Sequence, residues 1–238
     1  MRKRKIENST LVSYQKFVDA FILFLALWTI GGPEHSFVYS ATATLAFLCG
    51  LTMFIALLRY RKRDSMPGRQ LLTALAVLIM LYGTFTPMIG KLSLIDVSSA
   101  VGRDETLKGR TDVWRELVPA AMERPILGYG YGGFWTSEAR DEFDITDSHN
   151  GYLNLILNVG FIGLVLYGMF ILSSIRKAHR MLTQDFDWGA LWICCMVMGL
   201  LVNIAEVSFS SLTDRIMAVI LFLTVSSAAT TSNTREPR

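Results

Sequence analysis

The sequence predicts an all-α protein of the membrane, a bundle of about six transmembrane helices with one long polar loop. Hydrophobic residues form 52% of the 238-residue chain and charged residues 18%, and the mean hydropathy is +0.39. This composition is more apolar than that of a soluble domain. The apolar residues also gather into long runs, and a helix needs roughly 20 of them to cross the hydrocarbon core.

The apolar runs define the predicted order of helices. They cover residues 14–30, 36–58, 70–90, 152–173, 188–205 and 216–229. Gly31, Gly32 and Pro33 separate the first two, because proline cannot continue a helix and glycine frees the backbone. The chain thus divides into three helices in residues 1–90, a polar loop in 91–150, three helices in 151–229, and a tail at 230–238 that we expect to be disordered.

Basic residues predict the orientation, since lysine and arginine beside spans stay on the cytoplasmic side. Three basic clusters lie at residues 2–5, 59–69 and 176–180, before the first run, after the second and after the fourth. Six spans place all three clusters and both termini in the cytoplasm. The loop at 91–150, in which acids outnumber bases, then lies on the outer face. The first run lacks a clean small-residue cleavage site, so we expect a membrane anchor rather than a cleaved signal.

The cysteines and histidines predict neither a disulfide nor a metal site. Cys49, Cys194 and Cys195 fall inside predicted spans, and adjacent cysteines bridge only with strain. The three histidines lie in different parts of the chain, without the paired spacing of zinc ligands. We therefore expect no metal and no cofactor.

Within the loop, residues 111–123 predict an amphipathic helix, with acids in its first turn and Trp114 on an apolar stripe. Such a helix suits the membrane surface, and Trp114 and Trp135 suit the headgroup level. The alternative is a helix that only caps the bundle. The loop also holds arginines that can make two parallel bonds to a phosphate or remain solvated at the surface. These are Arg103, Arg110, Arg115, Arg124 and Arg140.

A glycine-rich stretch follows this helix, and Gly128, Gly130 and Gly133 match the spacing of a dinucleotide-binding turn. No predicted strand precedes it, so we do not predict a nucleotide site. The stretch is better interpreted as a turning loop whose backbone N–H groups approach a ligand together with nearby aromatic rings. Those rings belong to Tyr129, Tyr131 and Phe134.

His149 stands at the end of the loop, beside Asp147, Ser148 and Asn150 and directly before an apolar run. An imidazole there can accept a proton near neutral pH. The alternative is a surface histidine that caps the following helix together with Asn150.

The segment GRDETLKGRTDVWRELVPAAMERPILGYGYGGFW, followed by SHNGYLNLILNVGFIGLVLY, resembles the signature of the O-antigen ligase/polymerase superfamily, in particular its exopolysaccharide members. The resemblance covers residues 102–167. It implies a multispan enzyme that moves a glycan from an undecaprenyl-diphosphate carrier to an acceptor hydroxyl, on the periplasmic face of the bacterial inner membrane, without metal or nucleotide.

For individual residues, the resemblance implies that His149 acts on the acceptor hydroxyl and Arg110 on the donor diphosphate. The other predicted substrate-binding residues are Arg103, Arg115, Arg124, Trp114, Tyr129, Tyr131 and Asn150. The expected partners are the lipid-linked donor, an acceptor glycan or lipid, and the bilayer, with no nucleic acid.

Members of the superfamily carry more spans, so the resemblance implies a C-terminal portion of such an enzyme. A truncated, non-catalytic partner and a lipid-linked glycan transporter stay open as alternatives. The predicted spans hold few ionisable residues, mainly Asp19, which favours surface chemistry over translocation.

Overall fold

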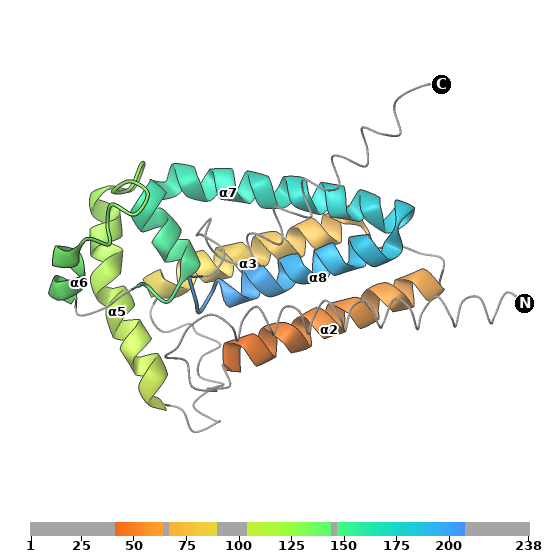
Figure 1. Ribbon diagram of the computed structural model, residues 1–238, viewed down its shortest axis with the longest axis horizontal. Coiled ribbons are helices and arrows are strands. Elements are labelled where there is room, and N and C mark those ends of the chain that lie inside the picture. Colours follow the sequence, from red (N-terminus) through yellow and green to blue (C-terminus); the bar gives the residue numbers. More distant parts are fainter. Residues whose placement is uncertain (1–40, 64–66, 90–103, 144–146, 208–238) are drawn as a thin grey trace, which may run out of the picture. The chain divides into compact units, whose positions relative to one another are not determined.

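The computed structural model describes residues 41–63, 67–89, 104–143 and 147–207, and these residues form helices and turns without a strand (Figure 1). The helices are α2 (Ala41–Lys62), α3 (Arg69–Ile89), α5 (Asp104–Glu123), α6 (Ser137–Phe143), α7 (Gly151–Gln184) and α8 (Phe186–Val202). The all-α class predicted from the sequence is confirmed for this part of the chain. The predicted spans at 14–30 and 216–229 and the tail at 230–238 lie outside the described residues.

Four predicted apolar runs correspond to α2, α3, α7 and α8. By length and composition, α3 and α7 are apolar enough to cross a membrane, and α8 is a shorter apolar helix. The helix that contains the span predicted at 152–173 continues to Gln184. The six-span count and the side of the membrane on which each loop lies stay predictions.

The described residues divide into two compact units. One comprises residues 41–72 and 173–198, and therefore α2 with the later part of α7 and most of α8. The other comprises most of α3, α5, α6, the earlier part of α7 and the end of α8. The second unit contains the loop whose chemistry the sequence singled out.

The first unit has polar contacts near its helix ends. Arg61 lies 3.5 Å from the Asp187 carboxylate, and its guanidinium carbon is 4.6 Å from the centre of the Phe186 ring. His179 Nε2 lies 3.0 Å from the Pro67 carbonyl oxygen. None of these residues matches the family signature, so this unit supplies no predicted site residue.

The core of the second unit joins α5 to the start of α7. Its members are Trp114, Leu117, Ala121, Phe134, Leu153, Ile156 and Leu157. They recur three and four positions apart in each helix, so one stripe of α5 packs against one stripe of α7. Burying a leucine or isoleucine stabilises a fold by roughly 1.5–3 kcal/mol, and this stripe therefore fixes α5. The predicted helix at 111–123 is confirmed, with its apolar face inward.

Within α7, the backbone breaks at Gly160, whose φ is 66° and ψ is −168°. Figure 1 shows the resulting change of direction between the first turns of α7 and the rest of the helix. The break separates a segment at 151–159 from a longer one at 161–184. The unbroken apolar run in the sequence predicts one uninterrupted span here.

Candidate active site

The turn at residues 147–150 leads into α7, and Asn150 forms the N-cap of that helix. Asn150 Oδ1 accepts a hydrogen bond from the Leu153 N–H at 2.9 Å, and the Asn150 carbonyl accepts one from Asn154 N–H at 2.9 Å. A capping side chain at this position satisfies a donor that the first helical turn leaves free. The capping role predicted for Asn150 is confirmed, and its complete burial removes it from direct contact with a ligand.

The other end of the Asn150 amide ties three elements together. Pro87 lies inside α3 and has no N–H, so the carbonyl four residues earlier, at Gly83, loses its helical partner. Asn150 Nδ2 donates to that carbonyl at 3.1 Å and to the Ile204 carbonyl, after α8, at 2.9 Å. The helix start is thereby fixed against α3 and against the chain that follows α8.

Ser148 joins the same turn to α5. Its hydroxyl donates to the Asn150 carbonyl at 2.8 Å, and its carbonyl accepts from Trp114 Nε1 at 2.8 Å. Ser148 is wholly buried and Trp114 is 2% exposed. Trp114 thus faces apolar contacts, as its stripe in the sequence predicts, and its indole N–H is used inside the protein. Trp114 positions the turn rather than lying where a substrate could touch it.

His149 lies between these two buried residues and is itself partly exposed. Its φ of 46° lies in the left-handed region, unlike that of any other described residue except glycine. Its side chain is 37% exposed, while Nδ1 is enclosed without a hydrogen bond. Nδ1 is therefore not part of the exposed surface of the ring.

Asp147 faces the enclosed nitrogen of His149. One oxygen of its carboxylate accepts from the His149 backbone N–H at 2.7 Å and lies 3.3 Å from Nδ1. The second distance is an electrostatic contact rather than an aligned hydrogen bond, since Nδ1 has no hydrogen-bond partner. A carboxylate at Nδ1 favours the tautomer with hydrogen on Nδ1, which leaves the Nε2 lone pair free to take a proton. In the sequence, Asp147 is recognisable only as a neighbour of His149. An acidic side chain two residues before the histidine can bond its backbone N–H, and this spacing is the signal that could have identified Asp147.

The glycine-rich turn after α5 docks into the break in α7. In a straight helix, the N–H groups at positions 161 and 162 would bond the carbonyls at 157 and 158. Instead, the Phe161 and Ile162 N–H groups donate to the carbonyls of Pro125 and Ile126 at 2.8 and 3.3 Å. The freed carbonyls of Leu157 and Asn158 accept from the Tyr129 and Gly130 N–H groups, both at 2.8 Å. Two hydrogen bonds within α7 are thus replaced by four hydrogen bonds between α7 and the turn.

These bonds correct the interpretation of the turn as a ligand-binding loop. The Gly132 N–H also donates within the protein, to Asn158 Oδ1 at 2.8 Å, and the Gly133 N–H donates to the Gly130 carbonyl at 2.9 Å. The backbone donors expected to approach a ligand are thus already occupied. Phe134 belongs to the core, whereas Tyr131 is 65% exposed.

Two further side chains of this turn are engaged with the protein. Tyr129 donates its hydroxyl hydrogen at the end of α5, where Glu123 Oε2 lies 2.7 Å away and the Ala120 carbonyl 3.2 Å away. Burial, and then the Glu123 hydrogen bond, raises the pKa of the Tyr129 hydroxyl. Trp135 Nε1 donates to Asn154 Oδ1 at 2.6 Å, so its indole N–H is also used within the protein. The headgroup level of Trp135 stays a prediction.

The predicted arginines are spread along α5. Arg110 lies in α5 four residues before Trp114, and Arg103 lies outside the described residues. Arg115 is 73% exposed and bonds the Asp112 carboxylate at 2.6 Å. Arg124 follows the helix, with its guanidinium 4.8 Å from the centre of the Tyr129 ring. At 1.5 Å per residue, the backbones of Arg110 and Arg124 lie ~21 Å apart along the direction of α5. One diphosphate group therefore cannot lie close to both residues.

The fold and this turn define a class: a helical membrane protein with a partly exposed histidine at the mouth of an apolar helix. A family model described as O-antigen ligase matches residues 37–168, more than half of the chain, and the chain belongs to this family. The resemblance seen in the sequence is confirmed. The family and the apolar composition are those of a membrane protein.

A comparison with curated proteins gives one similar relative, the exopolysaccharide production protein ExoQ of Rhizobium meliloti (strain 1021). It is 28% identical over 177 residues, which cover 69% of this chain and 39% of the relative. The chain thus spans well under half of the length of this relative. No solved structure matches the chain significantly.

Proposed function

We propose that this protein transfers a glycan from an undecaprenyl-diphosphate carrier to an acceptor hydroxyl, in polysaccharide assembly at the periplasmic face of the bacterial inner membrane. Membership of the O-antigen ligase family and the similarity to an exopolysaccharide production protein support the substrate class. The observation that carries the proposal is the His149 ring, which is partly exposed and has a carboxylate at Nδ1.

His149 is the proposed general base. The acceptor hydroxyl gives its proton to Nε2 while its oxygen forms a bond to the anomeric carbon of the donor sugar. The bond from that carbon to the diphosphate oxygen breaks, and the electron pair leaves with the diphosphate. Asp147 stabilises the resulting imidazolium through the 3.3 Å contact at Nδ1. General-base catalysis contributes typically about 10²–10⁴-fold to a rate.

Arg110 is the proposed partner of the diphosphate. Residues four apart lie on one side of a helix, so the Arg110 backbone position is one turn from Trp114, which bonds the carbonyl preceding His149. This spacing supports Arg110 as a donor-binding residue on the same side of α5 as that bond. A guanidinium can hold two phosphate oxygens and stabilise the charge that develops on the leaving group. Arg115 and Arg103 stay secondary candidates for donor binding.

The test is transfer from a purified lipid-linked donor to an acceptor glycan, with the protein in nanodiscs. His149→Ala should lower turnover by about 10²–10⁴-fold and leave the protein folded. Arg110→Lys should lose most activity, because an ammonium cannot reproduce the paired geometry of a guanidinium. His179→Ala and Arg180→Lys, in the other unit, are the matched controls and should retain turnover.

The outcomes separate the proposal from its alternatives. Wild-type turnover by His149→Ala would remove the histidine from the chemistry and leave it a surface residue of the helix cap. Donor binding by the wild-type protein without any transfer would support a non-catalytic partner. Movement of the intact donor across a sealed bilayer would support a transporter.

A further inference from the structure

The turn between α5 and the glycine-rich stretch presents two large apolar side chains to the outside. Ile126 is 65% exposed and Leu127 69%, and no other large hydrophobic residue in the described part of the chain is more exposed than Leu127. Leaving such a side chain in water rather than burying it forgoes roughly 1.5–3 kcal/mol. Two adjacent exposed apolar side chains at the tip of a turn indicate a surface that contacts an apolar partner.

The tip is held rigidly in this exposed position. The carbonyls of Pro125 and Ile126 accept hydrogen bonds from α7, and the Gly128 N–H donates to the Arg124 carbonyl at 2.9 Å. An added side chain at Gly128 or Gly160 would collide with the backbone of the other segment. The apolar side chains therefore cannot fold back onto the protein without breaking the contact between the turn and α7.

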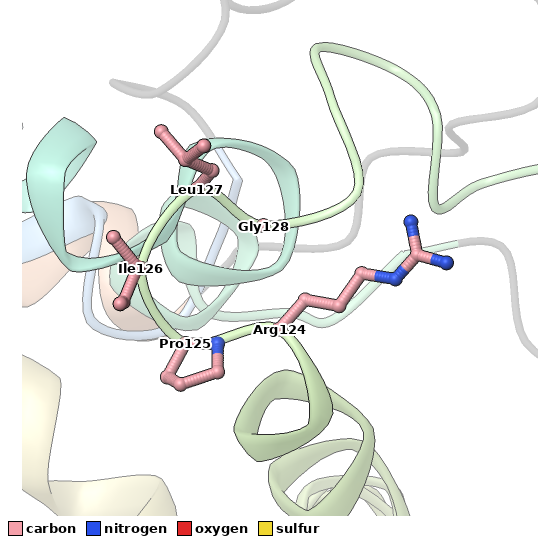
Figure 2. A pocket seen from close by; sticks show the side chains of 5 residues that line it. All are labelled: Arg124, Pro125, Ile126, Leu127 and Gly128. Atoms are coloured by element: carbon pink, nitrogen blue, oxygen red, sulfur yellow. The ribbon is translucent and has the colours of Figure 1, made fainter.

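Figure 2 shows the arrangement of this turn, which lines an open pocket of ≈ 360 Å³. Ile126 and Leu127 project from one side of the turn, and the Arg124 side chain extends in another direction. The Arg124 guanidinium lies over the Tyr129 ring. A cation and an aromatic ring next to an apolar tip are typical of the boundary between headgroups and hydrocarbon.

The exposure of the side chains of α7 changes at its break, where the turn docks. Between residues 151 and 160, all side chains but those at 155 and 159 are buried. After the break, a row of large apolar side chains is exposed, comprising Phe161, Ile162, Val165, Leu166 and Met169. This spacing forms one face of a helix, and α7 is apolar enough to cross a membrane. The first two residues of this face are the ones that bond the turn.

We infer that residues 125–127 insert into the hydrocarbon of the bilayer beside the exposed face of α7, with Arg124 at the level of the lipid phosphates. Bilayer lipid is the occupant that fits, because the tip continues the apolar face of a candidate span and is bordered by a cation. The transmembrane part of α7 then begins near Phe161 rather than at residue 152. The segment at 151–159 lies on the polar side of that level, within ~15 Å of it, and the His149 turn precedes that segment.

This inference depends on the membrane setting and not on the transfer reaction, so its test measures no activity. A nitroxide spin label is placed at Leu127→Cys in the full protein, with Cys49, Cys194 and Cys195 replaced by alanine. The protein is held in nanodiscs of phosphatidylethanolamine and phosphatidylglycerol. Collisions with lipid-soluble oxygen and with a water-soluble nickel chelate are compared. The matched control is a label at Tyr131→Cys, which is 65% exposed in the same loop.

The Leu127 label should collide with oxygen several-fold more, relative to the nickel chelate, than the Tyr131 label. A second label at Ile126→Cys should behave as the Leu127 label does, which guards against a variant that fails to fold. Equal nickel accessibility at residues 127 and 131 would overturn the inference by placing the tip in water. Protection of residues 126 and 127 from both reagents would also overturn it, because a protein segment would then cover the tip.

Discussion

Two turns carry the recognisable parts of the sequence signature, and the structure uses them in opposite ways. In the glycine-rich turn at 124–133, the backbone N–H groups are consumed by α7 and by the turn itself. In the turn at 147–150, two fully bonded residues, Ser148 and Asn150, hold a third whose ring is partly exposed. The first turn fixes the shape of a helix, and the second presents a titratable group.

The difference shows that a conspicuous sequence pattern does not by itself indicate a binding site. Glycines at 128 and 160 are required because two backbones approach closely there, so their conformational freedom serves packing. His149 adopts a left-handed conformation without being glycine. Such a conformation costs of order 1–3 kcal/mol and is often found at functional sites. The comparison predicts that substitutions in the first turn change stability, and that those around His149 change activity.

The largest expected effect is loss of stability in Gly160→Ala. The φ of 66° disfavours alanine, and its Cβ would overlap the Ile126 carbonyl. The left-handed conformation alone costs about 1–2 kcal/mol, and the overlap must also displace the turn, so we expect a loss of more than about 3 kcal/mol in the free energy of unfolding. Denaturant unfolding in detergent measures it.

Gly132→Ala is the control for that substitution. Its φ is 72°, but nothing lies within 4 Å of an added Cβ. It should cost only the conformational part, about 1–2 kcal/mol. Equal losses in the two variants would mean that the turn does not pack into the break of α7.

The next effect concerns Asn150, whose amide donates to the carbonyls of Gly83 and Ile204. Asn150→Asp keeps the capping oxygen but places an acceptor against two acceptors, and we expect a loss of about 3 kcal/mol in unfolding free energy. Lowering the pH should recover part of it, since a protonated carboxyl can donate one of the two bonds. A variant as stable as the wild type at neutral pH would contradict the role of the Asn150 amide in linking α7 to Gly83 and Ile204.

The sequence predicted the helices better than it predicted their interruption. The apolar stripe around Trp114 predicted α5, and the capping residue Asn150 predicted the start of α7, because both signals are local in the sequence. The break at Gly160 lies within an unbroken apolar run, and a glycine there is compatible with a continuous helix. It arises from carbonyls and N–H groups supplied by residues 125–130, far away in the sequence. No local pattern encodes those partners.

The candidate site shows the same limit. Asn150 was predictable as a cap, yet its bond to Gly83 depends on Pro87 freeing a carbonyl 67 positions earlier in the chain. Trp114 was predictable as apolar, but its bond to the Ser148 carbonyl decides that it belongs to the interior. The roles of His149 and Arg110 came from the family resemblance and stay predictions.

A smaller effect is expected on activity in Asp147→Asn. The asparagine oxygen can still accept the His149 backbone N–H, so the turn should keep its shape, but the charge at Nδ1 is lost. A partly exposed ion pair contributes roughly 0.2–1 kcal/mol, which corresponds to at most about a fivefold decrease in turnover. Transfer kinetics and unfolding should be measured together. Nitrogen NMR of His149 should show a shift in tautomer population, which a purely structural role would not produce.

Unchanged turnover and an unchanged tautomer population in Asp147→Asn would mean that the carboxylate serves only the backbone of the turn. A parallel loss of folding would mean the same, because the activity would then follow stability. Asp147→Ala separates the two roles further, since it removes the backbone bond as well as the charge.

The smallest effects separate two tyrosines of the glycine-rich turn. Tyr129→Phe removes the hydroxyl that bonds Glu123 and should cost about 1 kcal/mol in unfolding free energy. Tyr131→Phe, at an exposed position, should stay within about 0.5 kcal/mol of the wild type. Because the folded-state pKa of Tyr129 is raised from 10.0, its contribution is complete below that pH. It declines as the pH rises through the raised pKa, so the difference between wild type and Tyr129→Phe should shrink in alkaline buffer.

If Tyr131 touches the donor as predicted, Tyr131→Ala should raise the KM for the donor while leaving stability unchanged. A stability loss in Tyr131→Phe equal to that in Tyr129→Phe would show that the exposed ring is also engaged by the protein, and would weaken its assignment to substrate.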